Sequence, residues 1–229
     1  MISRTEAAGL VDHTLLRPDA TRLEIEALVA EAAGLGAYAV CVEGRWVEDA
    51  VSVASGRGLK IVTVCGFPTG RAEPEAKAAE AAGAVSRGAD EVDMVADLEA
   101  VRLGEWGRVE HGVAAVRAAI DEVEPGRTLK VILETAAFGD KAIEEAALAA
   151  ERGGANFVKT STGFHPAGGA SVEAVRLLHE VVGGRLGIKA SGGIRTAAEA
   201  VALLEAGATR IGTSRTRDIL DGWGTQPDG

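Results

Sequence analysis

Two lysines, Lys159 and Lys189, stand late in segments that read as buried strands, where an amine can become a nucleophile. Lys159 follows Phe157-Val158 and Lys189 follows Ile188, and the chain has only six lysines against eighteen arginines. An ammonium in an apolar setting loses hydration, and a second ammonium nearby repels it. Both effects lower the amine pKa from its ordinary value of about 10.4. The alternative is that each lysine snorkels from a strand end to solvent.

Two carboxylates occupy comparable positions in other apolar segments. Asp93 lies between Val92 and Met94, and Asp12 follows Val11. A lone carboxylate in an apolar strand needs a cation or hydrogen bonds. Asp93 could therefore be a structural partner of a buried lysine, or it could transfer protons during a reaction.

The elements that must position these residues alternate regularly between strand and helix. The predicted strands are Asp12–Leu15, Ala37–Val42, Lys60–Cys65, Glu91–Val95, Leu129–Glu134, the segment that ends near Lys159, the segment around Ile188, and Arg210–Ser214. The predicted helices are Thr5–Leu10, Arg22–Leu35, Trp46–Gly56, Pro74–Arg87, Trp106–Val123, Lys141–Arg152, Ser171–Val182 and Thr196–Ala206. Near-continuous apolar strands separated by helices indicate a parallel sheet that is covered on both faces.

A repeated Gly-Ala-x-x-(Val/Ile) motif supports this division. It occurs at Gly36, Gly88, Gly154 and Gly207. In each copy we expect the glycine to end a helix at its C-cap before the chain turns directly into a strand.

Eight strand–helix units within 229 residues favour one (β/α)₈ TIM barrel, with a short N-terminal helix, over an open doubly wound sheet. Length and composition alone would also permit two small domains. No linker or low-complexity segment marks a boundary, so we expect one domain over residues 1–229. Residues from about 221 to 229 read as a loose tail.

Composition narrows the possible partners. A net charge of −10 argues against a nucleic-acid or anionic-membrane surface. The N-terminus has no signal-peptide core and no apolar run is long enough to cross a bilayer, so we expect a cytoplasmic protein without membrane contacts. Cys41 and Cys65 stand in apolar strands and are expected to be buried free thiols, as suits a reducing compartment.

Two glycine-rich turns late in the chain could bind an anion. Gly192-Gly193 follows the Lys189 strand, and Gly212 and Ser214 end the last one. Glycines let backbone N–H groups approach an oxyanion, and a following helix N-terminus adds its positive dipole. A Gly-Gly turn is weak evidence alone, but phosphate sites after strands seven and eight are common in TIM barrels. The four histidines show no metal-ligand spacing, and no dinucleotide-binding Gly-x-Gly-x-x-Gly motif joins a strand to a helix.

At these residues the chain closely resembles the deoxyribose-phosphate aldolases, a family of class I aldolases on a (β/α)₈ barrel. The motifs follow one another in fixed order over nearly the whole chain: Val11–Pro18, Gly66–Pro68, Glu91–Val95, Phe157–Phe164, Lys189–Thr196 and Arg210–Ser214. The resemblance implies reversible cleavage of 2-deoxy-D-ribose 5-phosphate into D-glyceraldehyde 3-phosphate and acetaldehyde, with no metal or other cofactor.

The resemblance also implies roles for particular residues. Lys159 corresponds to the lysine that forms a Schiff base with acetaldehyde, and Lys189 to the second lysine, which lowers the first one's pKa and takes part in proton transfer. Asp93 corresponds to the carboxylate that exchanges protons through water with Lys189, and Asp12 to the carboxylate near the sugar hydroxyl. The residues that it implies at the substrate and its phosphate are Thr162, Gly163, Gly192, Gly193, Gly212 and Ser214.

Three departures from the family pattern bear on this assignment. Ala96-Asp97 stands where the family often has a hydrophobic residue and asparagine, and Arg215 stands where a second serine is usual. Arg215 could strengthen phosphate binding or point away from the site. Some members also carry a tail tyrosine that assists proton transfer, whereas Tyr38 is the only tyrosine here. Such a step would then need water, Lys189 or Asp93.

Two other functions compete with this interpretation. One is a different Schiff-base aldolase, similar to transaldolase, and the other is a catalytically silent barrel that only binds a phosphorylated ligand. The expected partners are small sugar phosphates and aldehydes. We also expect a homo-oligomer, either a dimer or a tetramer.

Overall fold

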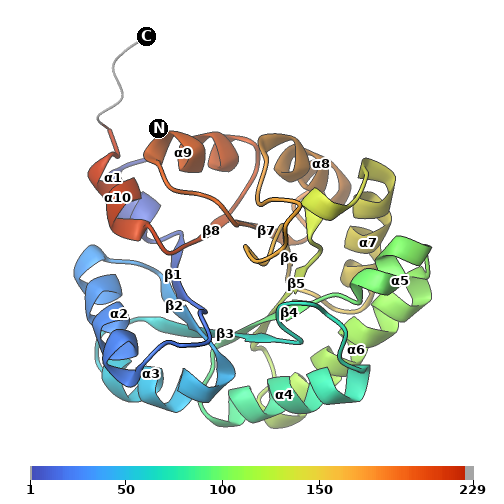
Figure 1. The fold of residues 1–229 in the computed structure, drawn as a ribbon, viewed down its shortest axis with the longest axis horizontal. Helices are drawn as coiled ribbons and strands as arrows, with labels where there is room; N and C mark the ends of the chain where they lie inside the picture. Colours follow the sequence, from blue (N-terminus) through green and yellow to red (C-terminus); the bar gives the residue numbers. More distant parts are fainter. Residues whose placement is uncertain (1, 225–229) are drawn as a thin grey trace.

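The computed structural model describes residues 2–224, in which eight parallel strands close into a barrel inside a ring of helices (Figure 1). The strands are β1 (Val11–Leu15), β2 (Ala39–Val42), β3 (Lys60–Cys65), β4 (Glu91–Val95), β5 (Thr128–Ile132), β6 (Phe157–Lys159), β7 (Gly187–Ser191) and β8 (Arg210–Thr213). Each strand pairs with the next, and β1 also pairs with β8. This closure confirms the predicted (β/α)₈ barrel and rules out an open sheet.

The helices follow the strands in alternation. The α-helices are α1 (Arg4–Ala8), α2 (Arg22–Leu35), α3 (Val47–Ala54), α4 (Pro74–Ser86), α5 (Leu98–Leu103), α6 (Trp106–Val123), α7 (Asp140–Arg152), α8 (Val172–Val182), α9 (Ala197–Glu205) and α10 (Thr216–Asp221). Two short 3₁₀ turns, η1 (Gly44–Trp46) and η2 (Thr135–Ala137), complete the order. Helices α5 and α10 were not predicted, because six residues are too few for a clear helical period.

The repeated glycine motif lies at four helix ends, as predicted, but only Gly36 is itself the C-cap, and Gly88, Gly154 and Gly207 each follow the C-cap residue. Gly36, Gly88, Gly154 and Gly207 have φ values of 72°, 101°, 90° and 116°. A residue with a side chain is strained at positive φ, so glycine is the suitable residue where each helix turns into the next strand.

Several predicted boundaries differ from the structure by one or two residues; the second strand, for example, begins at Ala39 and not at Ala37. The fifth strand ends at Ile132, and Glu134 beyond it has a left-handed backbone with φ 54°. The expected loose tail starts too early at 221, because Trp223 is packed in the core and its Nε1 donates to the Ile2 carbonyl at 3.0 Å. Residues 225–229 of that tail lie outside the described residues.

Apolar side chains fill the layer between the sheet and the helices. On β5, Leu129 and Val131 belong to the same buried cluster as Val116 and Ile120 of α6. The alternate residue Lys130 is fully buried without joining that cluster. Because successive strand residues face opposite sides, apolar residues on the helix side leave Lys130 on the barrel side.

The two predicted free thiols are also buried. Cys41 and Cys65 have no exposed area, and burial raises the pKa of the Cys41 thiol to about 11. Both are therefore protonated at neutral pH. Within residues 2–224, no helix combines the length and apolar character needed to span a bilayer.

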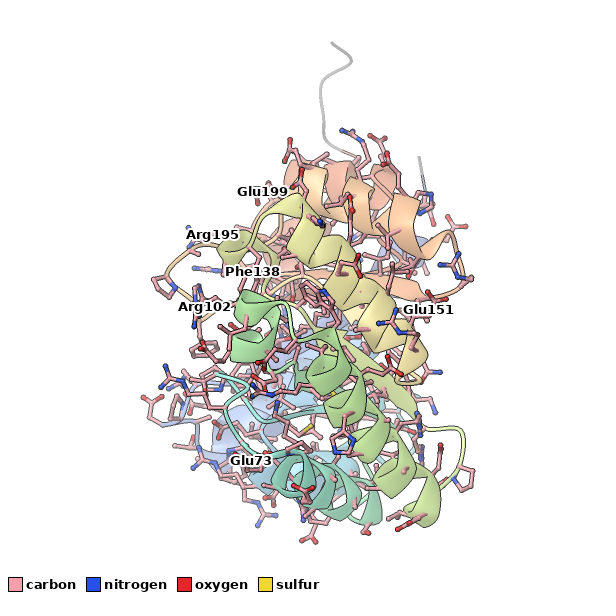
Figure 2. The ribbon with its side chains drawn as sticks, turned by 90° about the vertical axis from the view of Figure 1, so that its right-hand side faces the viewer. Glu73, Arg102, Phe138, Glu151, Arg195 and Glu199 are labelled. Atoms are coloured by element: carbon pink, nitrogen blue, oxygen red, sulfur yellow. The ribbon has the colours of Figure 1, made fainter. Side chains whose placement is uncertain are left out.

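The loops that follow the strands gather at one end of the barrel. Figure 2 shows Arg102, Phe138 and Arg195 toward this end, while Glu151, near the end of α7, lies toward the other. In a parallel barrel all strands deliver their carboxyl-terminal residues to the same face. Candidate site residues from distant parts of the chain therefore meet there.

Candidate active site

The two candidate lysines lie side by side within the barrel. Lys159 on β6 and Lys189 on β7 are paired residues in the strand register, and both are buried. Lys159 Nζ lies 2.8 Å from Asp93 Oδ2, and Lys189 Nζ lies 2.7 Å from the same oxygen. The structure thus brings these three candidate residues together.

The surroundings of the two amines shift their pKa values in opposite directions. Burial lowers the pKa of Lys159, the Asp93 carboxylate partly opposes this, and the Lys189 ammonium lowers it further. Burial also acts to lower the pKa of Lys189, but Asp12 and Asp93 outweigh it and the net shift is upward. Lys159 is therefore the amine that loses its proton more readily, and Lys189 stays an ammonium.

Asp93 stays ionised because three cations surround it. Its other oxygen, Oδ1, accepts a hydrogen bond from Lys130 at 2.7 Å. Burial alone would raise the pKa of this carboxyl, but Lys130, Lys159 and Lys189 together hold it well below its ordinary value. The result is a buried carboxylate that touches both candidate catalytic lysines.

Asp12 lies deeper than a substrate ligand would. Its carboxylate accepts a hydrogen bond from Lys189 and another from Arg210 at 2.8 Å, and the residue has no exposed area. It is not among the residues that line the adjacent pocket. This position favours an electrostatic effect on Lys189 over direct contact with a sugar hydroxyl.

A further set of buried charges was missed by the sequence analysis. Lys130, which falls in the predicted strand Leu129–Glu134 but was not named as a candidate, lies in the middle of β5, with its Nζ 2.6 Å from Glu91 Oε2. Arg210 on β8 also contacts Glu91, at 3.2 Å, and its guanidinium lies 3.7 Å from the ring centre of Tyr38. The sequence holds one signal for Glu91. It stands two residues before Asp93 in the same strand, so both side chains face the same side of the sheet.

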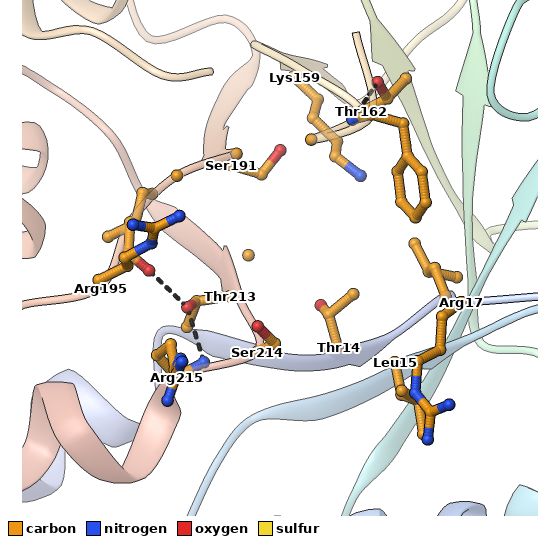
Figure 3. Close-up of a pocket in the computed structure, with 17 residues that line it drawn as sticks. Thr14, Leu15, Arg17, Lys159, Thr162, Ser191, Arg195, Thr213, Ser214 and Arg215 are labelled. Atoms are coloured by element: carbon orange, nitrogen blue, oxygen red, sulfur yellow. Dashed lines mark hydrogen bonds between the residues drawn. The ribbon is translucent and has the colours of Figure 1, made fainter. Parts of the chain in front are cut away.

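A pocket of about 580 Å³ opens above Lys159 at the carboxyl-terminal face. Figure 3 shows the Lys159 side chain pointing into it, with Arg195, Ser214 and Arg215 across the pocket. The residues that line it are Thr14, Leu15, Leu16, Arg17, Lys159, Thr162, Gly163, Phe164, Ser191, Gly192, Gly193, Ile194, Arg195, Gly212, Thr213, Ser214 and Arg215. They include all six predicted substrate and phosphate residues other than Asp12.

The glycines of this pocket leave backbone groups accessible. The N–H groups of Gly163, Gly193 and Ser214 donate to no other described residue. Position 212 also needs a glycine for a steric reason, because a Cβ there would come within 2.9 Å of the Lys189 side chain. The loops after β6, β7 and β8 thus each offer a free backbone donor that an anion in the pocket could bind.

Two N–H groups at the start of α9, the helix that follows the Gly192-Gly193 turn, already have an internal partner. The Glu199 carboxylate accepts from the N–H groups of Arg195 and Thr196, at 2.8 Å and 3.0 Å, at the start of α9. This capping box leaves those two N–H groups with an internal partner. These two N–H groups are therefore not available to an anion in the pocket.

Thr162 is held by a buried carboxylate that the sequence did not single out. Glu134, fully buried, accepts from the Thr162 hydroxyl at 2.7 Å, and that hydroxyl accepts from the Phe164 N–H at 3.1 Å. The hydroxyl proton is thus directed at Glu134. Thr162 can still accept a hydrogen bond from a ligand, but its clearest effect is to shape the loop that carries Gly163.

Comparison with known proteins agrees with this geometry. Residues 7–222 match the model of the DeoC/LacD family aldolases. This chain belongs to the DeoC/LacD aldolase family. The match extends from α1 past the end of α10 and includes the whole barrel.

Individual members of the DeoC/LacD family are similar over almost their full length. A deoxyribose-phosphate aldolase of Kocuria rhizophila is 54% identical over 97% of this chain and 99% of its own. One of Nocardia farcinica is 55% identical over 96% of each chain. A tetrameric deoxyribose phosphate aldolase from Aeropyrum pernix superposes with a TM-score of 0.88 at 34% identity, over 96% of this chain and 91% of that one.

Proposed function

We propose that this protein catalyses the reversible aldol cleavage of 2-deoxy-D-ribose 5-phosphate to D-glyceraldehyde 3-phosphate and acetaldehyde. The observation that carries this is the buried Lys159 amine, whose pKa is lowered by burial and by Lys189, at the base of an open pocket. Membership of an aldolase family and relatives named for this substrate support the same reaction.

The reaction begins with the neutral Lys159 amine. Its lone pair adds to the C1 aldehyde of the open-chain sugar phosphate, and loss of water gives a protonated Schiff base. Removal of the C3 hydroxyl proton then breaks the C2–C3 bond, and the bonding electrons pass to C2 and the iminium to form an enamine. D-glyceraldehyde 3-phosphate leaves at this step.

Release of acetaldehyde needs a proton at C2 of the enamine, followed by hydrolysis of the Schiff base. Lys189 is the charged acid nearest to Lys159, and Asp93 contacts both amines. We assign Lys189 and Asp93 to these proton transfers, with water completing the path to C2 and to the C3 hydroxyl. This assignment needs no tyrosine from the tail.

The substrate phosphate would lie at the glycine turns. N–H groups of Gly163, Gly193 and Ser214 supply donors, and the side chains of Arg195 and Arg215 lie on the same wall. Charge-assisted hydrogen bonds to an anion are roughly twice as strong as neutral ones. Binding at this end would hold the reacting carbon next to Lys159.

A direct assay tests the proposal. The protein is incubated with 2-deoxy-D-ribose 5-phosphate, and both D-glyceraldehyde 3-phosphate and acetaldehyde are measured. We expect equal amounts of the two products, with none from Lys159→Ala and normal rates from Lys141→Ala, which changes an exposed lysine on α7. Activity on another sugar phosphate alone would assign the chain to a different Schiff-base aldolase, and binding without products would indicate a silent barrel.

The same proposal includes three properties of the whole protein. We infer one domain over residues 1–229, supported by the closed barrel of residues 2–224. A homo-oligomer is supported by the tetrameric Aeropyrum pernix enzyme. A reducing compartment such as the cytoplasm suits the two buried free thiols.

A further inference from the structure

The ion pairs inside the barrel form one connected group of seven charged residues. Three of them have carboxylate side chains and four have basic side chains, and all seven residues are at least nine-tenths buried. They are Asp12, Glu91 and Asp93, and Lys130, Lys159, Lys189 and Arg210. A buried net charge is costly, so a group with equal numbers of positive and negative charges is favoured. Three carboxylates balance three cations, and one of the four basic groups must be neutral for the group to balance.

The contacts show which basic group gives up its proton. Lys130 contacts Glu91 and Asp93, and Lys189 contacts Asp12 and Asp93. Arg210 contacts Asp12 and Glu91, whereas Lys159 contacts only Asp93 among the carboxylates of the described residues.

Lys159 is therefore the least stabilised cation of the group. It shares its one carboxylate oxygen, Asp93 Oδ2, with Lys189. Arg210 cannot lose its proton in a protein. The structure thus balances its buried charge when Lys159 is a neutral amine, which is also the reactive form.

Lys130 has a special position in this balance. It is the register partner of Asp93 across β4 and β5, has no exposed area, and is absent from the pocket lining. Its ammonium binds Asp93 Oδ1 at 2.7 Å. Of the three lysines around Asp93, Lys130 lowers the pKa of that carboxyl most. Without Lys130, the negative charge of Asp93 would be compensated only by Lys159 and Lys189 among its described ion-pair partners.

We propose that Lys130 is a positioning residue for the aldol reaction: acting through Asp93, it supplies the third permanent cation of the buried group and so keeps Lys159 in the neutral, nucleophilic form. This rests on the proposed function only in naming the reaction; the charge state of Lys159 can be measured separately. Glu91 has the opposite effect on Lys159. Its carboxylate adds a negative charge to the buried group, next to Lys130 and Arg210, and so favours the protonated form of Lys159.

Two other titratable groups near Lys159, Cys41 and Glu134, do not set its charge. The Cys41 thiol on β2 faces the same region but is protonated, since burial raises its pKa to about 11. Glu134, beyond β5, bonds to Thr162 and makes no ion pair with another described residue. The charge on Lys159 therefore depends on Asp93, Lys189 and the cations that compete for Asp93.

The experiment measures the pH at which Lys159 becomes reactive. Each purified variant is treated over a pH series with a trace of acetic anhydride, and acetylation of each lysine is quantified by peptide mass spectrometry. A parallel series uses acetaldehyde with cyanoborohydride, which reports Schiff-base formation. The variants are wild type, Lys130→Met, Glu91→Gln, the double variant, and Lys60→Met, which removes a half-exposed lysine of β3.

The expected shifts have opposite signs. Lys130→Met should raise the half-maximal pH of Lys159 labelling by about one unit or more, because an uncompensated carboxylate favours the protonated amine. Glu91→Gln should lower it, the double variant should return toward wild type, and Lys60→Met should leave it unchanged. Restored reactivity in the double variant is a result that a purely structural role of Lys130 would not give.

The outcomes separate the two hypotheses. Equal Lys159 labelling profiles in wild type, Glu91→Gln and the double variant would overturn the charge balance, even if Lys130→Met fails to fold. A displaced acetylation profile without an acetaldehyde adduct in wild type would keep the charge balance and overturn the Schiff-base reaction.

Discussion

Lys159 and Lys189 are paired in register on adjacent strands, yet the structure gives their amines opposite tendencies to hold a proton. The difference comes from the number of carboxylates at each amine. Lys189 binds both Asp12 and Asp93, whereas Lys159 has only a shared oxygen of Asp93. One lysine can therefore act as an acid while its neighbour acts as a nucleophile.

Acetaldehyde followed by borohydride should add one ethyl group, located on Lys159. Its lowered pKa and its place at the base of the pocket make it the amine most able to form and keep a Schiff base. Intact-mass and peptide mass spectrometry would locate the adduct. Labelling spread over several lysines, or persisting in Lys159→Ala, would contradict the prediction.

Asp93→Asn and Lys189→Leu should each reduce kcat by about 10²-fold or more, the usual scale for positioned proton transfer. Their pH profiles should move in opposite directions. Lys189 lowers the pKa of Lys159, so its loss should raise the pH at which activity appears. Asp93 raises that pKa, so Asp93→Asn should lower this pH.

Rate–pH profiles of kcat/KM between mildly acidic and alkaline pH would measure both effects. Losses below about fivefold, far under the range of general acid–base catalysis, with unmoved profiles would leave both residues with structural roles only.

Ser214→Asp should weaken cleavage of the phosphorylated substrate while hardly changing the slow reaction of 2-deoxy-D-ribose. A carboxylate at this position on the pocket wall would repel the phosphate. Several charge-assisted hydrogen bonds, each worth about 1.5–3 kcal/mol, should be lost or strained together, so kcat/KM should fall by orders of magnitude. Steady-state kinetics with both substrates, and Ser214→Ala as the neutral control, would test this. Equal slowing of both reactions would place the defect in the fold.

Arg215→Ala should raise KM for the phosphorylated substrate by less than about tenfold, because an exposed charge contributes little. Arg215 lines the pocket, but its side chain is 61% exposed and its Nη1 lies 3.2 Å from Asp218 Oδ2. The matched control is Arg217→Ala, two residues along, which pairs with Glu31 and does not line the pocket. An unchanged KM would show that Arg215 points away from the anion.

Glu134→Gln should raise KM for the phosphorylated substrate by about tenfold, the scale of one hydrogen bond to a charged group. The Glu134 carboxylate accepts from both the hydroxyl and the N–H of Thr162, and glutamine has one acceptor oxygen where the carboxylate has two. The loop that presents Gly163 should then be less well ordered. Kinetics in a Thr162→Val background supply the control, since the two effects should not add if they share this contact. Additive losses would show that Glu134 acts elsewhere.

Much of the architecture followed from local patterns. The alternation of apolar strands with helices, and the Gly-Ala motif at four helix ends, were enough to predict eight units and a closed barrel. These features are local because helix periodicity and the need for positive φ depend on neighbouring residues alone. The helix boundaries at Arg22–Leu35 and Trp106–Val123 were predicted without error for the same reason.

Some residues of the candidate site could be recognised from the sequence, and others could not. Lys159, Lys189 and Asp93 stood out because charged residues are rare inside apolar strands, and the pocket turns stood out by their glycines. Glu91 and Arg210 did not, since each is the first residue of its strand, where a charge usually reaches solvent. Lys130 lies in the middle of β5, and its place in the buried group appears only once β4 and β5 are paired.

What the sequence determined by itself was the order of strands and helices and the kinds of residue that could do chemistry. Only the tertiary structure decided which charges share a carboxylate, because barrel closure sets the register between strands far apart in the chain. That register brings Asp12 and Arg210 together across 198 positions and leaves Lys159 with a single, shared partner. The proton affinity of a buried amine depends on such contacts, and local sequence does not contain them.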